Sequence, residues 1–281
     1  MLTIGIIELD DRCEVDLARI DAGWNIVQLT SKSLRSRPLK AQPMLGELNA
    51  IAILGTHPAK FRYAREALSL SKHVMVDFPP GGTPNEVLLL RELAERKGVR
   101  FHSPNLLKTE PGMREFRRTV DDPSSKLLSL TVSCNLTARG EVARLTKLMQ
   151  MLDLVEWMAG AKSVESRAQK SARVAGASAQ VILLTHENGV KSLLNLRSTH
   201  SSSFPTFWVD GIFDNSIVHL NPHGQSILVG RSDANGIRRV NWAEPALKYA
   251  LRDFMSLIGN ESARSDLTNF ERIFQLARKL A

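Results

Sequence analysis

Hydrophobic and polar residues follow, in turn, the periods of strands and of helices along the first 120 residues. Short apolar runs predict strands at residues 2–7, 24–29, 50–54, 73–76 and 99–102, and helical periodicity predicts helices at residues 11–21, 58–70 and 84–97. The last helix begins with a capping box, with Thr83 as N-cap, Pro84 at the first helical position and Glu86 completing the box. Strands and helices that alternate in this way predict βαβ units and a parallel sheet.

After about Val120 the pattern changes to a period of two. Residues 128–136 alternate between apolar and polar, which predicts a half-buried antiparallel strand. Further strands are expected at residues 163–167, 181–186, 190–196, 206–213, 216–220 and 226–229, with a hairpin turn at Glu187-Asn188-Gly189. Helices are expected at residues 144–158, 246–258 and 269–280, and the Ser/Ala-rich residues 169–179 are expected to form a surface loop.

The two patterns predict two domains, which a chain of 281 residues is long enough to form. Residues 1–120 form an α/β domain of the Rossmann type, which is a dinucleotide-binding architecture. Residues 121–281 form an α+β domain with a large, mostly antiparallel open sheet, which would serve substrate binding or oligomerisation.

Composition narrows the class of protein. Hydrophobic residues make up 43% and charged residues 23% of the chain, as in globular proteins. No apolar run approaches the roughly 20 residues of a membrane helix, and the first residues predict a strand and not a signal peptide. The two cysteines, Cys13 and Cys134, lie far apart and have no partners at metal-ligand spacing. We expect a cytoplasmic protein with no membrane contact, disulfide framework or metal site.

The net charge of +8 raises the question of an anionic partner. Most basic residues alternate with acidic ones on helices, as on a solvated face. A local cluster follows the second predicted strand, at Lys32, Arg35, Arg37 and Lys40, but no aromatic residues are interleaved with it. This favours a small anionic molecule as partner and argues against nucleic acid.

The segment Thr30-Ser31-Lys32-Ser33 is a candidate phosphate site. Hydroxyls and a cation after the second strand suit the 2′-phosphate of NADP, whereas NAD is usually held there by an acidic residue. An exposed basic loop without a ligand is an equally open interpretation.

Several motifs, in this order along the whole chain, resemble the glucose–fructose oxidoreductase / inositol dehydrogenase / MocA (Gfo/Idh/MocA) family. They are Ile53-Leu54-Gly55-Thr56 with the following helix, Lys72-His73-Val74 through Pro79, Asp153-Leu154 through Trp157 with Gly160, and the helix at 269–280. The resemblance implies an NAD(P)-dependent oxidoreductase and a homo-oligomer formed through the second sheet. It also implies that the terminal helix packs back on the first domain. It places cofactor contacts at Ser31, Lys32, Thr56, His57, Asp77, Phe78 and Pro79.

Within that family the chain is similar to the biliverdin reductase branch. The similarity rests on Asp77-Phe78-Pro79, Ser31-Lys32-Ser33 and Arg144-Leu145-Thr146. It implies an NADP(H)-dependent reductase in which Arg144, His102 and Lys108 form a cationic rim around an apolar floor at Phe78. Such a site would suit a flat anionic molecule, such as a linear tetrapyrrole carboxylate.

Three departures from the family pattern bear on activity. The dinucleotide-binding glycine loop falls on residues 8–13, where Glu8, Asp10 and Asp11 would oppose a pyrophosphate. An N-cap with an acidic first turn explains the same residues without a ligand. Phe78 replaces the family's lysine and cannot donate a proton, and Thr146 and Gln150 stand where the family has its Asp and His.

Three functions therefore stay open. The first is an NADP(H)-dependent oxidoreductase with an atypical, glycine-free phosphate loop. The second is a catalytically inactive relic of the fold, which binds no dinucleotide and serves as a ligand-binding or assembly subunit. The third, an enzyme of non-redox chemistry in the same cleft, has no motif in its favour. Loss of the glycines favours the second function, and the Ser-Lys-Ser and Arg-Leu-Thr segments favour the first.

Overall fold

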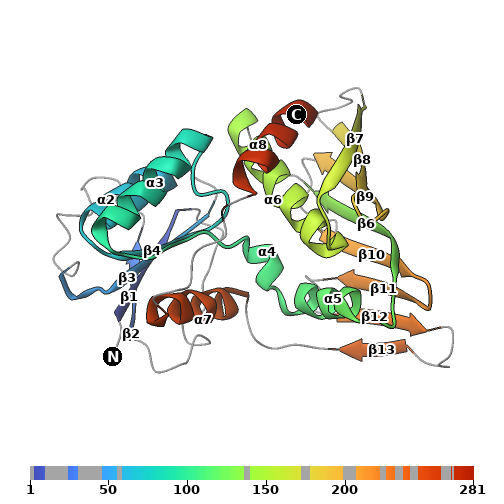
Figure 1. Cartoon of the computed structure of the whole chain (residues 1–281), viewed down its shortest axis with the longest axis horizontal. Coiled ribbons are helices and arrows are strands. Elements are labelled where there is room, and N and C mark those ends of the chain that lie inside the picture. Colours follow the sequence, from blue (N-terminus) through green and yellow to red (C-terminus); the bar gives the residue numbers. More distant parts are fainter. Residues whose placement is uncertain are drawn as a thin grey trace. The chain divides into compact units, whose positions relative to one another are not determined.

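The computed structural model of the chain describes residues 3–9, 25–30, 46–55, 59–135, 140–171, 178–198, 207–221, 226–231, 237–240, 246–260, 267 and 269–281 (Figure 1). The chain divides into two compact units. Unit 1 consists of Met1–Leu106 and Pro245–Gln275, and unit 2 consists of Leu107–Glu244 and Leu276–Ala281.

Unit 1 contains a five-stranded sheet in the order β2-β1-β3-β4-β5. Its strands are β1 (Thr3–Glu8), β2 (Asn25–Thr30), β3 (Ala50–Leu54), β4 (His73–Val76) and β5 (Phe101–His102). Every neighbouring pair is parallel, which confirms the predicted α/β fold class, although unit 1 ends at Leu106 and not at residue 120. The helix predicted at residues 11–21 lies outside the described residues.

Helices cover both faces of this sheet (Figure 1). Helices α2 (Lys60–Ser69) and α3 (Pro84–Lys97) lie on one side, and α7 (Ala246–Gly259) lies on the other. The side with α7 is closed by a cluster of buried residues that includes Ile4, Ile6, Met75, Leu251 and Phe254. The predicted capping box of α3 is confirmed, because the Thr83 hydroxyl accepts from the Glu86 N–H at 3.3 Å and the Glu86 carboxylate accepts from the Thr83 N–H at 3.2 Å.

Unit 2 contains an eight-stranded sheet in the order β13-β12-β11-β10-β6-β9-β8-β7. Its strands are β6 (Leu127–Asn135), β7 (Ser163–Lys170), β8 (Ser178–His186), β9 (Lys191–Ser198), β10 (Phe207–Phe213), β11 (Ser216–Asn221), β12 (Ser226–Arg231) and β13 (Ile237–Val240). Neighbours are antiparallel except for the parallel pair β6 and β9. The predicted large, mostly antiparallel sheet is confirmed.

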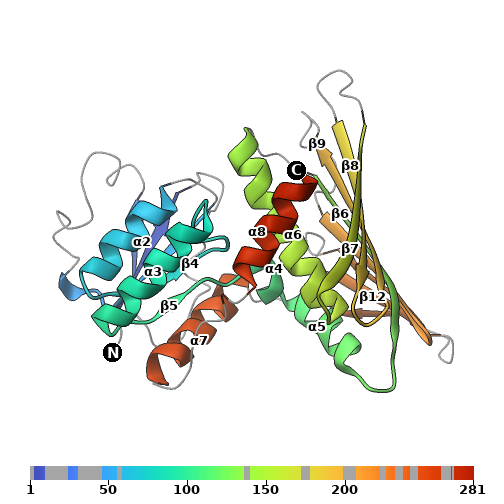
Figure 2. The ribbon, with the colours of Figure 1, turned by 45° about the horizontal axis from the view of Figure 1, so that its top comes forward.

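One face of this sheet carries the helices of unit 2. Helix α6 (Glu141–Ala159) buries a long apolar face against it, and α5 (Pro111–Asp121) lies beside α6 (Figure 2). Among the described residues, no helix covers the opposite face. The last helix, α8 (Phe270–Leu280), belongs to unit 1 as far as Gln275 and to unit 2 from Leu276. None of the described helices combines the length and hydrophobicity needed to cross a bilayer.

The structure corrects several expectations about elements. Helix α5, the short helix α4 (Leu106–Thr109) and strand β13 were not predicted. Helix α5 was missed although Met113, Phe116 and Val120 follow the helical spacing of three and four residues. The bounds predicted for the loop at residues 169–179 are wrong at both ends, because β7 continues to Lys170 and β8 begins at Ser178.

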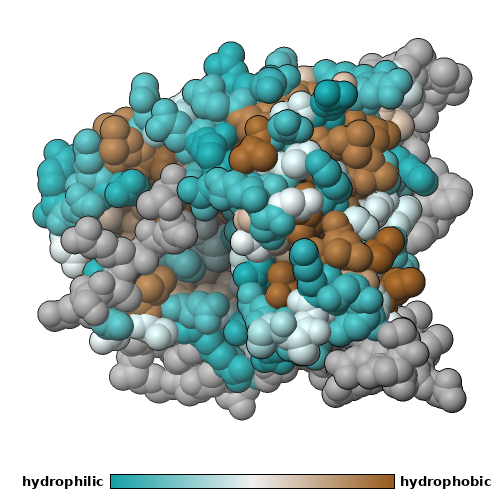
Figure 3. All heavy atoms as spheres, turned by 45° about the vertical axis from the view of Figure 1, so that its right-hand side comes forward, coloured by the Kyte–Doolittle hydropathy of each residue, from teal (hydrophilic) through white to brown (hydrophobic). Residues whose placement is uncertain are grey.

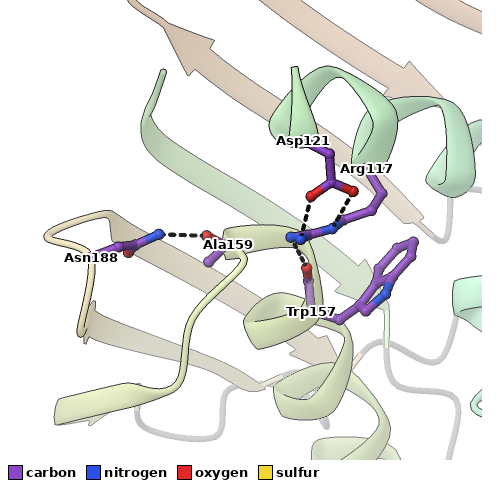
Figure 4. Close-up of polar contacts among 5 residues, drawn as sticks. All are labelled: Arg117, Asp121, Trp157, Ala159 and Asn188. Atoms are coloured by element: carbon purple, nitrogen blue, oxygen red, sulfur yellow. Dashed lines mark hydrogen bonds and ion pairs between the residues drawn. The ribbon is translucent and has the colours of Figure 1, made fainter. Parts of the chain in front are cut away.

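The C-terminal end of α6 is held by side chains from two other elements (Figure 4). Arg117 on α5 donates to the Trp157 carbonyl at 2.7 Å and also forms two hydrogen bonds with the carboxylate of Asp121. Asn188, from the hairpin turn, donates to the Ala159 carbonyl at 2.8 Å. These contacts satisfy carbonyls that a helix end leaves without partners within the helix.

We expect Gly160→Ala to destabilise unit 2 more than Gly189→Ala does. Both glycines have positive φ values, 74° and 84°, so each alanine loses about 1–2 kcal/mol in the left-handed region. A Cβ at Gly160 would also lie 2.8 Å from Arg117 Nη1, whereas nothing lies within 4 Å of one at Gly189. Urea unfolding of the two variants measures the difference, and equal losses would contradict the close packing around Arg117.

Candidate functional site

The carboxyl ends of all five parallel strands meet at one edge of the unit 1 sheet. The strand order reverses between β1 and β3, because β2 lies on one side of β1 and the later strands lie on the other. Open α/β sheets bind ligands outside the carboxyl ends of the strands at such a reversal. This edge is therefore the candidate functional site.

The first strand contributes an acidic end to this edge. Glu8, the last residue of β1, accepts a hydrogen bond from Gln28 on β2, with 3.3 Å between Nε2 and Oε1. Leu9 is buried and donates its N–H to the Leu54 carbonyl at the end of β3. Asp10, Asp11 and the remainder of the predicted glycine-free loop lie outside the described residues, as do the predicted contacts Ser31, Lys32, Thr56 and His57.

The turn after β4 carries the other predicted cofactor contacts, Asp77, Phe78 and Pro79. The Asp77 N–H donates to the Ile53 carbonyl at 3.0 Å, and the Phe78 N–H donates to the Pro104 carbonyl at 3.0 Å. The Asp77 carbonyl accepts from Lys60 Nζ at 2.9 Å. The peptide bond between Phe78 and Pro79 is cis. The backbone of this turn is thus tied to β3, to α2 and to the segment after β5.

The Phe78 side chain lies in an aromatic cluster of unit 1. Only 5% of Phe78 is exposed, and its ring meets that of Phe270 edge to face, with 5.9 Å between the ring centroids. The ring of Phe270 in turn stacks on Phe274. This cluster is apolar and well ordered by packing, and Phe78 contributes neither a proton nor a charge to it.

His102, at the end of β5, is not the cation that the sequence analysis predicts. Burial lowers the pKa of His102 to about 4, so the ring is neutral near neutral pH. The ring stacks on Phe254 of α7, with an angle of 9° between the ring planes. The predicted positive charge of His102 is wrong, because burial keeps the ring neutral, and its place in a ligand-binding rim stays a prediction.

The other two predicted rim residues, Arg144 and Lys108, belong to unit 2. Lys108 forms an ion pair with Asp153 of α6 at 2.7 Å, so its charge is balanced within the unit. Arg144 lies in the first turn of α6 and is partly exposed. Gln150, further along the same helix, is 5% exposed and faces the interior. Arg144 is thus the partly exposed cation among these three side chains, since Lys108 is paired with Asp153 and Gln150 is buried and uncharged.

A serine–histidine pair that the sequence analysis did not single out lies in unit 2. His186 Nε2 is 2.7 Å from the Ser192 hydroxyl, and His186 Nδ1 is 3.0 Å from the Ala161 carbonyl. Ser192 and His186 are each 1% exposed, so no substrate reaches the hydroxyl. Burial lowers the pKa of His186. We interpret the pair as a satisfied polar contact within the protein interior.

Lys60 is the residue of the site that the sequence analysis missed. It is 4% exposed, although lysine is rarely buried. The helical spacing could have predicted its burial, because Lys60 shares the buried face of α2 with Ala64, Ala67 and Leu68. The described residues contain no group of histidine, cysteine, aspartate or glutamate side chains suited to hold a metal ion.

The chain resembles solved dehydrogenase and oxidoreductase structures over nearly its whole length. A dehydrogenase from Chromobacterium violaceum has a TM-score of 0.75 at 14% identity, over 100% of this chain and 94% of that one. UDP-N-acetylglucosamine 3-dehydrogenase from Acidithiobacillus ferrooxidans has a TM-score of 0.74 at 16% identity, over 99% and 96%. An oxidoreductase from Agrobacterium radiobacter, in complex with NAD+, L-tartaric acid and magnesium, has a TM-score of 0.70 at 13% identity, over 99% and 95%.

These similarities concern the fold. The sequence matches no known protein-family model. At identities of 13–16% they show a shared architecture, and the family resemblance stays a prediction from the sequence. The biliverdin reductase branch within that family is a finer assignment, which the fold does not distinguish.

We expect protonation of His102 to oppose folding. Its pKa is about 4 in the folded protein and about 6.5 in the unfolded chain. Stability is therefore lost as the pH falls from about 6.5 to about 4, by about 1–3 kcal/mol in total. His102→Phe keeps a ring on Phe254 and removes this loss, so its unfolding free energy should fall less on acidification than that of the wild type. The pKa values of His73 and His186 are also lowered, so the unfolding free energies of both proteins keep a smaller dependence on pH.

Urea unfolding of both proteins at several pH values between about 4.5 and about 7 measures this difference. Parallel pH profiles for the two proteins would contradict a neutral, buried His102.

Proposed function

We propose that the chain is an oxidoreductase that binds a nicotinamide dinucleotide, with preference for NADP(H), at the carboxyl edge of the unit 1 sheet. The observation that carries the proposal is the strand reversal at this edge together with the tied Asp77–Pro79 turn. Support also comes from the fold shared with two dehydrogenases and with an oxidoreductase that was solved with NAD+.

The residues proposed to hold the cofactor come from successive strand ends. Asp77, Phe78 and Pro79 lie at the described edge, and Thr56 and His57 follow β3 in the chain. Ser31 and Lys32 follow β2 and would meet a 2′-phosphate. The cofactor itself supplies hydride transfer when bound. Phe78 shapes an apolar surface and leaves proton transfer to another group.

The proposed substrate is a small, flat, anionic molecule, and a linear tetrapyrrole carboxylate is its most specific form. The support is the similarity of Asp77-Phe78-Pro79 and Arg144-Leu145-Thr146 to the biliverdin reductase branch. Arg144, partly exposed in the first turn of α6, would pair with a substrate carboxylate. Electrostatic pairing is its proposed role, because a guanidinium with a pKa above about 12 is a poor acid.

The alternative function is a binding or assembly subunit that has lost the dinucleotide. Glu8 favours it, because a carboxylate stands at the strand end that normally approaches the pyrophosphate. The position of Phe78 also favours it, because the aromatic cluster fills the place where the resembled family carries its lysine. The two functions differ in one observable, the affinity for NADPH.

Under the proposed function, the wild type binds NADPH weakly and binds it better than NADH. Glu8→Gly combined with Asp10→Gly should improve NADPH binding by about 1–3 kcal/mol, because two carboxylates no longer oppose the pyrophosphate. Lys32→Ala should remove the preference for NADPH. Isothermal titration calorimetry of each protein with both dinucleotides measures these affinities.

Lys97→Ala is the matched control for the loss of one positive charge. Lys97 is an exposed lysine in the last turn of α3, also in unit 1, and it should leave the preference for NADPH unchanged. If neither the wild type nor the double glycine variant binds either dinucleotide, the oxidoreductase proposal falls and the subunit function takes its place.

We infer that the face of the unit 2 sheet that none of the described helices covers binds a second copy of the chain. Large hydrophobic side chains on this sheet are exposed, including Leu128 (46%), Leu183 (53%), Ile212 (46%) and Ile217 (58%). They are spread over β6, β8, β10 and β11, and Figure 3 shows hydrophobic residues among hydrophilic ones on the surface. Contiguous exposed apolar area on a folded protein marks interaction sites.

If this face forms a homodimer, Leu183→Glu should convert the dimer into a monomer at micromolar concentration. A charge buried in an apolar interface loses water without gaining a partner. Leu89→Glu is the matched control, because Leu89 on α3 is exposed to 51% but lies in unit 1. Light scattering coupled to size exclusion measures the mass. A monomeric wild type would contradict the inference, and so would a Leu183→Glu variant that stays dimeric.

A further inference from the structure

A buried lysine stands at the carboxyl edge of the unit 1 sheet. Lys60 is the first residue of α2, and only 4% of it is exposed. Two physical effects oppose a cation in this place. Burial takes its amine out of water, and the amino end of a helix carries a partial positive charge. A lysine here needs a strong acceptor.

One acceptor is a backbone carbonyl of the candidate site. Lys60 Nζ donates to the Asp77 carbonyl oxygen at 2.9 Å. A hydrogen bond from an ammonium to a carbonyl is stronger than one between neutral groups. The bond joins the start of α2 to the turn after β4, which is where the proposed cofactor contacts lie.

The same peptide group is held from its other side as well. The Asp77 carbonyl and the Phe78 N–H belong to one peptide unit, and the Phe78 N–H donates to the Pro104 carbonyl at 3.0 Å. The preceding N–H, that of Asp77, donates to Ile53 on β3 at 3.0 Å. With Lys60 and Pro104 on opposite ends, the peptide plane between Asp77 and Phe78 has a fixed orientation.

We propose that Lys60 is a positioning residue for ligand binding, which acts by fixing the Asp77–Phe78 peptide at the edge of the sheet. This inference rests on the proposed function, because the ligand it serves is the nicotinamide dinucleotide. The orientation of the peptide sets the direction in which the Asp77 and Phe78 side chains leave the turn. Without the amine, the carbonyl turns toward another donor and the contact surface changes.

A second lysine provides a matched control. Lys72 Nζ also donates to backbone carbonyls, that of Leu48 at 2.6 Å and that of Gly46 at 3.4 Å. Leu48 and Lys72 precede β3 and β4, so these bonds lie at the amino edge of the same sheet. Lys60 begins helix α2 and Lys72 follows its end, and each donates to a carbonyl in a loop. Only the former is at the ligand edge.

The test compares Lys60→Met, Lys60→Gln and Lys72→Met with the wild type by NADPH titration calorimetry. Lys60→Met should weaken binding about tenfold, which corresponds to the loss of one hydrogen bond from a charged donor. Lys60→Gln keeps an N–H donor and should recover part of the affinity. Lys72→Met should lower the unfolding temperature in the same way as Lys60→Met but leave the affinity within about twofold.

Hydrogen exchange of the proteins without ligand separates this inference from the proposed function. The amides of residues 77 and 78 should exchange faster in Lys60→Met than in the wild type. In Lys72→Met these two amides should exchange at the rate of the wild type. If the wild type binds no dinucleotide, the proposed function falls, and unchanged exchange in Lys60→Met would then overturn the positioning role independently. Equal NADPH affinities for Lys60→Met and Lys72→Met would overturn it in a binding-competent protein.

Discussion

The parallel ladder between β3 and β4 continues one residue beyond β4, through the hydrogen bond from Asp77 to Ile53, and the candidate site depends on this extension. It brings the Asp77–Pro79 turn to the carboxyl edge, where Lys60 and Pro104 fix the next peptide group. The same turn places the Phe78 ring against Phe270. One stretch of backbone therefore links the sheet, helix α2, the segment after β5 and the terminal helix.

The fold of unit 1 does not depend on the glycine loop or on the catalytic lysine of the resembled family. The sheet order and the tied turn are present although Glu8 and Phe78 replace residues that the resembled family uses for chemistry. Burial of aliphatic side chains stabilises the fold and its strand order, and this burial does not require the residues of the site. Cofactor affinity depends on a few surface positions, and those can change without loss of the fold.

The sequence predicted the architecture where hydrophobic periodicity is strong. The βαβ rhythm, the capping box of α3 and the alternation in β6 and β8 were all visible, because burial imposes a period of 3.6 or 2 on the residues that it selects. Helix α5 was not predicted, although Met113, Phe116 and Val120 carry the helical spacing. Hydrophobic periodicity could not reveal the environment of single polar residues. His102 reads as a cation but is neutral beside Phe254, and Lys60 reads as a surface residue but is buried. Both depend on contacts between segments that are distant in the chain.

Hydrogen exchange of the wild type with and without saturating NADPH tests the central claim most directly. The account predicts slower exchange in residues 6–9, 52–55, 76–78 and 101–103, which end or follow the strands at the carboxyl edge of the five-stranded sheet. Strands β7 to β11 of unit 2 should show no general protection. Unchanged exchange throughout unit 1, or protection confined to the eight-stranded sheet, would contradict a dinucleotide site at this edge.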